Sequence, residues 1–116
     1  MKYAFVFLVC LASPAFADDP VVEAAKMSMS GNSATISVTI RHGDTGWDHY
    51  ADGWAVLAPD GTQLGYRKLL HPHENEQPFT RSLSGVTIPA GIDHVLIRAS
   101  DNVTGPAQNT YRLNVR

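Results

Sequence analysis

Cysteine is almost absent from this chain of 116 residues. The single cysteine, Cys10, lies in a short apolar run near the N-terminus. Bulky Val9 precedes it, so Cys10 is not placed as a lipid-acceptor cysteine would be. The rest of the chain can therefore form no disulfide, no thiolate metal site and no cysteine nucleophile.

Long hydrophobic runs are also missing. The N-terminal apolar run, residues 3–11, is too short to span a bilayer. Lys2 precedes it, and Ala15-Phe16-Ala17 has the small-x-small pattern that signal peptidase reads. We predict a signal peptide over residues 1–17 and export to the periplasm or out of the cell. We expect no membrane insertion after signal cleavage.

Positive charge is scarce. Once the leader is removed with Lys2, eight Lys and Arg residues stand against eleven Asp and Glu residues, and the basic residues form no patch. A mildly acidic chain of this kind is a poor ligand for nucleic acid or anionic lipid. We expect no nucleic-acid partner. The expected partner is another periplasmic or envelope protein.

No window of the sequence has the apolar repeat of a helix, and period-two alternation dominates. Gly31-Asn32 between two alternating runs predicts a hairpin that pairs Met27 with Ile36. Pro59-Asp60-Gly61 predicts a second hairpin with a three-residue loop.

The second hairpin's predicted register pairs Ala58 with Thr62. Continued outward, it pairs Trp54 with Tyr66 and Asp52 with Lys68, and it brings His49 close to His71. Trp54 is then a core residue.

Seven short strands separated by turn signals predict an all-β fold, an immunoglobulin-like antiparallel β-sandwich of about seven strands in a single domain, residues 18–116. The predicted strands cover residues 21–30, 33–41, 53–58, 62–70, 79–83, 93–100 and 110–115.

This fold predicts that two polar loops, residues 42–52 and 71–77, lie at the same end of the sandwich, with Asp101 and Asn102 approaching them. Histidine and carboxylate side chains together suit zinc or copper(II). The first hypothesis is a metal site there, with His49, His71 and His73 as ligands and Asp48 or Glu74 in support.

Three other interpretations remain open. The same end could be a protein-interaction surface anchored by Trp47 and Tyr50. It could be a solvated, salt-bridged cap that Arg81 and Arg98 reach. A small enzyme is less favoured, because no nucleophile elbow or phosphate-binding loop is present. The remaining residues assigned to the binding surface are His42, Asp44, Asp52, Glu76 and Gln77.

Two segments, 44–54 and 71–83, resemble a group of small exported bacterial proteins with no established activity, and the likeness runs over most of the mature chain. His71-Pro72 is also faintly similar to the His-Pro-x-x-x-x-His element of superoxide reductase. Position 77 is Gln rather than His, and the thiolate ligand of that family has no counterpart here. The resemblance therefore implies an exported domain and no iron chemistry.

Overall fold

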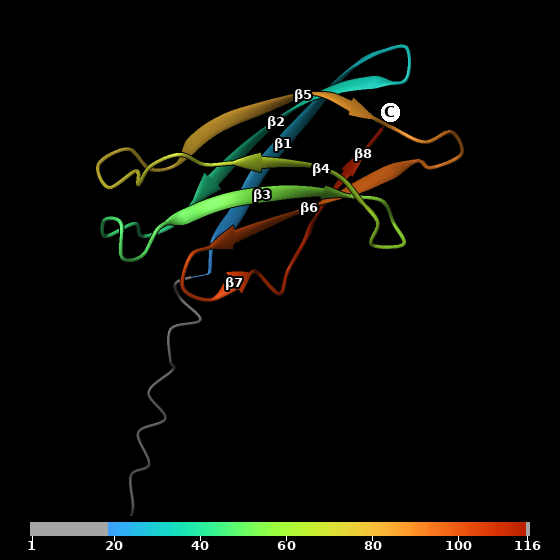
Figure 1. The fold of residues 1–116 in the computed structure, drawn as a ribbon. Helices are drawn as coiled ribbons and strands as arrows, with labels where there is room; N and C mark the ends of the chain where they lie inside the picture. The colour runs from blue at the N-terminus through green and yellow to red at the C-terminus, as the bar shows by residue number, and fades with distance from the viewer. Residues whose placement is uncertain (1–18, 116) are drawn as a thin grey trace, which may run out of the picture.

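Two antiparallel β-sheets face each other in the computed structural model, which describes residues 19–115 (Figure 1). In the first sheet the order is β1 (Val21–Ser30), β2 (Ser33–Arg41) and β5 (Phe79–Thr87). The second sheet has the order β4 (Gln63–Lys68), β3 (Ala51–Leu57), β6 (His94–Asp101) and β7 (Gly105–Pro106). In this sheet β8 (Tyr111–Asn114) also pairs with β6.

The predicted fold class, an all-β antiparallel sandwich, is confirmed. Within residues 19–115 there are eight strands in place of about seven, because the short strand β7 was not predicted. No helix in this range is long and apolar enough to cross a membrane. The predicted signal peptide lies outside the described residues.

The first hairpin has its predicted register. Met27 pairs with Ile36, and Met29 pairs with Ala34. Because side chains alternate between the two faces of a strand, this register turns the apolar residues of β1 and β2 toward the same side. On β2 those residues are the most deeply buried, with Ile36 and Ile40 fully inaccessible to solvent.

The core lies between the two sheets. Trp54 of β3 is fully buried, as predicted, and packs in one cluster with alternate residues of β2 and β6. The inward-facing residues of β6 are Val95, Ile97 and Ala99. Asp101 follows in the same phase and is also buried, so the inward face of β6 ends on a carboxylate.

The second hairpin departs from its predicted register. Its loop is as expected, because the Ala58 amide donates to the Thr62 carbonyl at 2.7 Å. A β-bulge between Val56 and Leu57 then shifts the pairing by one residue, so that Trp54 faces Arg67 and Gly53 faces Lys68. The predicted pairs of Trp54 with Tyr66 and of Asp52 with Lys68 are therefore wrong. A bulge adds one unpaired residue to one strand and reverses the faces beyond it.

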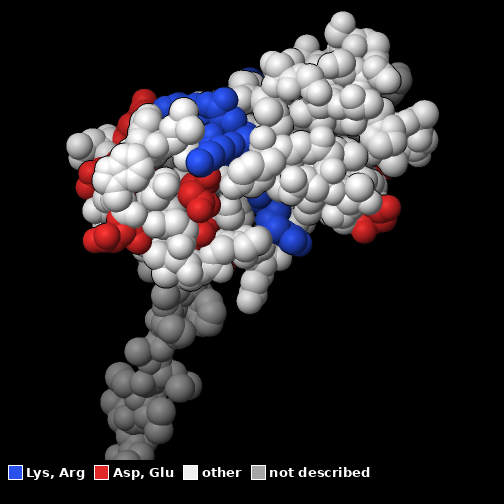
Figure 2. Space-filling view, viewed as in Figure 1, with Lys and Arg blue, Asp and Glu red and all other residues white. Residues whose placement is uncertain are grey.

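Three loops meet at one end of the sandwich, which we call the loop end: residues 42–50, 69–78 and 102–104 (Figure 1). In the view of Figure 2 most of the visible Asp and Glu atoms lie at this end, with Lys and Arg atoms beside them. His94 begins β6 at the opposite end. The fold thus brings the two polar segments of the sequence together.

The shifted register makes a testable prediction about Gly53 and Tyr66. A Cβ added at Gly53 would collide with the hydroxyl end of Tyr66, which crosses over this glycine. We expect Gly53→Ala to lower the free energy of unfolding by about 1–2 kcal/mol, because overpacking forces Tyr66 to move.

A double-mutant cycle in urea provides the control. In a Tyr66→Ala background, the loss of unfolding free energy caused by Gly53→Ala should be smaller than in the wild type by at least about 0.5 kcal/mol. Additive effects of the two substitutions would contradict the bulged register.

Candidate metal centre

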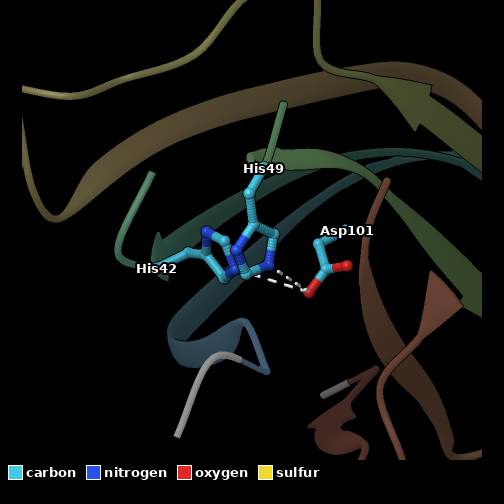
Figure 3. Close-up of side chains that lie close together, drawn as sticks. All are labelled: His42, His49 and Asp101. Carbon is cyan, nitrogen blue, oxygen red and sulfur yellow. Dashed lines mark hydrogen bonds and ion pairs between the residues drawn. The ribbon is translucent and has the colours of Figure 1, made fainter. Parts of the chain in front are cut away.

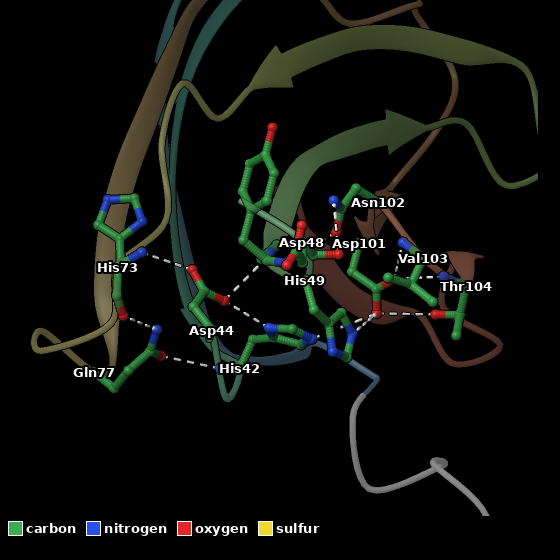
Figure 4. Close-up of polar contacts among 12 residues, drawn as sticks. His42, Asp44, Asp48, His49, His73, Gln77, Asp101, Asn102, Val103 and Thr104 are labelled. Atoms are coloured by element: carbon green, nitrogen blue, oxygen red, sulfur yellow. Dashed lines mark hydrogen bonds and ion pairs between the residues drawn. The ribbon is translucent and has the colours of Figure 1, made fainter. Parts of the chain in front are cut away.

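Asp44 is a buried carboxylate that joins three segments of the loop end (Figure 4). Its Oδ1 accepts hydrogen bonds from His42 Nδ1 at 2.6 Å and from the Ala51 amide at 3.1 Å. Its Oδ2 accepts from the His73 amide at 2.7 Å. An ionised carboxylate can only accept, so the proton of this pair lies on His42 Nδ1. Asp44 thereby fixes both the orientation and the tautomer of the His42 ring.

Gln77 fastens the same loops from the other side. Its Oε1 accepts a hydrogen bond from the His42 amide at 3.0 Å, and its Nε2 donates to the His73 carbonyl at 2.8 Å. Because one side-chain amide bridges two backbone groups 31 positions apart in the sequence, loop 69–78 is held against the end of β2.

Three donor atoms converge next to this network (Figure 3). His42 Nε2 and His49 Nε2 each lie 3.4 Å from Asp101 Oδ2. The two imidazole rings meet edge to face, with centroids 4.8 Å apart and an interplanar angle of 83°. All three donor atoms lie within 4.8 Å of one another. Bonds of about 2.0–2.2 Å to a tetrahedral metal place neighbouring ligand atoms about 3.3–3.6 Å apart, so the two contacts with Asp101 have the right length.

His42 Nε2 has no hydrogen-bond partner. The side chain is completely buried, and the 3.4 Å contact with Asp101 lacks hydrogen-bond geometry. An unsatisfied buried polar atom costs about 1–3 kcal/mol, so its retention requires a reason. The atom is aimed at the point where His49 and Asp101 also converge, and a metal ion there would satisfy it.

Asp101 is held by the turn that follows it. Oδ1 accepts from the amides of Val103 at 2.8 Å and Thr104 at 2.6 Å, and Oδ2 accepts from the Thr104 hydroxyl at 2.9 Å. Burial alone would raise the pKa of Asp101. The hydrogen bonds from Thr104, Val103 and His49 outweigh burial and lower the pKa below its usual value. The carboxylate is therefore ionised at neutral pH, as a metal ligand must be.

Asn102 positions the turn that carries His49. Its Nδ2 donates to the carbonyls of Trp47 at 3.0 Å and Asp48 at 3.3 Å, and its Oδ1 accepts from the Tyr50 amide at 2.9 Å. Asn102 directly follows the donor residue Asp101, and it fixes the turn that carries a second donor residue, His49.

His73, a predicted ligand, has a different environment. Its buried ring stacks on Phe79 with centroids 3.9 Å apart and planes 8° from parallel, and its Nε2 accepts from Arg81 Nη2 at 2.9 Å. Burial, followed by the charge of Arg81, lowers the pKa of His73, so the ring is neutral. The guanidinium group occupies Nε2, and the buried Nδ1, which has no hydrogen-bond partner, belongs to no group of three donors among residues 19–115.

His71 is exposed and lies beside His73, with ring centroids 4.5 Å apart. Within residues 19–115, the group of three or more donors close enough to share a metal is His42, His49 and Asp101, so the predicted set of His49, His71 and His73 does not come together. The bulge in the second hairpin explains the difference, because it shifts the strand that leads to His71 by one residue.

The other predicted residues lie around the site without entering it. Asp48 and Glu74 are exposed and lie outside the donor group. Asp52 Oδ1 accepts from the Ser100 hydroxyl at 2.9 Å, and Glu76 lies 3.9 Å from Arg81. Trp47 is 65% exposed, and the Tyr50 ring packs against its edge.

Two of the three donors could have been found from strand phase. His42 and Asp44 continue the inward-facing series of Ile36, Val38 and Ile40 on β2, and Asp101 continues that of β6. Charged residues in the inward phase of a strand mark a buried polar site. The sequence analysis placed His42 and Asp44 on a binding surface and expected Asp101 to lie near them. It did not assign His42 and Asp101 as metal ligands or Asp44 as the residue that orients His42.

Comparisons with known proteins give one relative. A protein of Halomicrobium mukohataei named "Putative lipoprotein" is 41% identical over 85 residues, which are 73% of this chain and 41% of that protein. The chain therefore spans less than half the length of this curated relative. No family model matches the sequence, and no solved structure matches it.

Asp44→Asn tests the network. An amide has one accepting oxygen in place of two and adds an NH2 group facing backbone donors, so at least one buried donor loses its partner. We expect the free energy of unfolding to fall by about 2–4 kcal/mol in urea titrations. Asp48→Asn, at an exposed carboxylate of the same loop end, is the control and should change stability by less than about 0.5 kcal/mol. Equal effects of the two substitutions would show that Asp44 does not hold the loops.

Proposed function

We propose that this protein is an exported, non-catalytic binding module that holds a divalent metal ion, zinc or copper(II), at His42, His49 and Asp101. The observation that carries the proposal is His42 Nε2, a buried nitrogen without a hydrogen-bond partner that points at two other metal-ligating atoms. Two imidazole nitrogens and one carboxylate oxygen form a donor set that both metals accept.

The surroundings of His42 support a metal more than a simple ion cluster. With the proton on Nδ1, the lone pair of Nε2 faces the carboxylate of Asp101, and two acceptors in contact repel each other. A cation between them turns this repulsion into attraction. The hydrogen bond from Nδ1 to Asp44 is the arrangement that commonly orients a metal-bound histidine and raises its basicity.

Export of the module is part of the proposal. The predicted signal peptide of residues 1–17 supports it, and so does the similarity to the Halomicrobium protein with a lipoprotein name. We place the mature domain, residues 18–116, in the periplasm or elsewhere outside the cytoplasm. In this proposal a resident metal acts through binding.

Thermal unfolding with and without metal tests the site. A ligand that binds only the folded state stabilises it by RT ln(1 + [L]/Kd), about 2.7 kcal/mol at one hundred times Kd. We expect zinc or copper(II) to raise the melting temperature by several degrees, and His42→Ala or His49→Ala to abolish the rise. His71→Ala is the matched control, an exposed histidine of the same end, and should keep it. An unchanged melting temperature at millimolar metal would contradict the proposal. If only His71→Ala abolished the rise, the metal would bind at His71 and not at His42, His49 and Asp101.

A second candidate function is recognition of another envelope protein at the loop end. Three large apolar side chains from its three loops are exposed there: Trp47 is 65% exposed, Leu70 67% and Val103 61%. Exposed aromatic residues with a charged rim are typical anchors of protein interfaces. Asp48 and Glu74 supply negative charge, so a partner with basic residues would fit.

Trp47→Ala tests this candidate. Because most of the Trp47 side chain is in solvent, we expect the free energy of unfolding to change by less than about 0.5 kcal/mol. A partner isolated with the tagged protein from the envelope fraction should be lost at the same time. Val21→Ala, at an exposed apolar residue of β1, is the control and should retain it. Loss of stability in Trp47→Ala would show that Trp47 covers the core instead.

A further inference from the structure

The hydroxyl group of Thr104 lies between two carboxylates. Thr104 Oγ1 is 2.9 Å from Asp101 Oδ2 and 3.4 Å from Asp19 Oδ1. A hydroxyl has one hydrogen and can donate it to one acceptor at a time. The shorter contact goes to Asp101, so Asp19 receives the weaker of the two hydrogen bonds from this hydroxyl. A cation is the natural partner for acceptors gathered in this way.

Asp19 is held near this point by the residue that follows it. Pro20 is buried, and a residue before proline is restricted to extended backbone conformations. The N-terminal segment of the described chain thus reaches the loop end beside the turn that contains Asp101 and Thr104.

The donor set proposed above contains three protein ligands, whereas closed zinc sites have four. We propose that Asp19 is the fourth donor, so that the N-terminal segment of the mature chain completes the metal centre. This inference rests on the proposed function of the His42, His49 and Asp101 site. The predicted cleavage after Ala17 would leave Asp19 as the second residue of the mature protein.

Asp101 and Asp44, the buried carboxylate hydrogen-bonded to His42, already balance the charge of a dication. Asp19 is therefore proposed for its position beside Asp101 and Thr104, and not to neutralise the centre. The Asp19 carboxylate lies outside the group of converging donor atoms, so its side chain must turn away from Thr104 to reach the metal.

Cobalt(II), whose visible spectrum reports coordination number and ligand exchange, is the probe. The exported protein, carrying a tag only at its C-terminus, is titrated with cobalt(II) and then with imidazole. We expect Asp19→Asn to weaken cobalt binding at least tenfold and to make the spectrum respond to imidazole, because a coordination position has opened. The wild-type spectrum should respond little.

Asp48→Asn is the matched control, since it removes one exposed negative charge from the same end without touching the donor set. It should bind cobalt like the wild type. The melting temperature without metal should be the same for all three proteins, which separates ligation from a structural role of Asp19.

The outcomes distinguish the two proposals. If wild type and Asp19→Asn bind cobalt with the same affinity and the same spectrum, the inference about Asp19 is overturned and the three-residue site stands. A wild-type spectrum that shifts strongly with imidazole would also overturn it, because an external donor then takes the fourth position. If the wild type binds no cobalt, zinc or copper, the proposed function itself fails.

Discussion

The hydrogen bond between Asp44 and His42 is the interaction on which the loop end depends. Asp44 is the point where the end of β2, the start of β3 and loop 69–78 meet, and its two oxygens serve a donor from each. With Asp44 in place, the His42 ring has one orientation and one tautomer, and Nε2 can only face Asp101 and His49. Without it, three chain segments lose a shared anchor. The position of the candidate ligands is therefore a consequence of one buried carboxylate.

The sandwich explains why charged groups are buried there at all. On β2 and β6 the inward-facing side chains are apolar until the strands end, and then the same phase continues as His42, Asp44 and Asp101. Each of these groups loses hydration, which is costly unless partners replace the water. Asp44 accepts hydrogen bonds from three protein donors and Asp101 from four, whereas the His42 ring is satisfied at Nδ1 only. Two buried imidazole nitrogens at this end lack a hydrogen-bond partner, His42 Nε2 and His73 Nδ1, and His42 Nε2 is the one that faces a carboxylate. A cation shared with His49 and Asp101 would satisfy the nitrogen of His42.

Local sequence patterns were sufficient for the fold and for the first hairpin. Alternation of apolar residues and the Gly31-Asn32 turn fix the pairing of Met27 with Ile36, because a shift by one residue would expose every apolar side chain. The same reasoning failed in the second hairpin, where β3 is buried on both faces and its alternation carries no register signal. The bulged register leaves the Tyr66 ring over Gly53 and Gly65 close to Leu83 and Val86, contacts that alternation along a single strand does not encode. For that reason His49 was expected opposite His71, whereas its ring lies against His42. The composition of the loop end was predictable, but the choice among its histidines was not.

The central claim is that His42 presents an unprotonated Nε2 to a metal shared with His49 and Asp101. Long-range proton–nitrogen NMR correlations of the imidazoles, recorded with 15N-labelled histidine at neutral pH before and after zinc is added, test it most directly. The account predicts that His42 carries its proton on Nδ1 throughout, and that zinc shifts the Nε2 resonances of His42 and His49 while those of His71 and His73 stay in place. A His42 ring protonated on both nitrogens, with no histidine resonance changed by zinc, would contradict it and show a buried ion cluster instead.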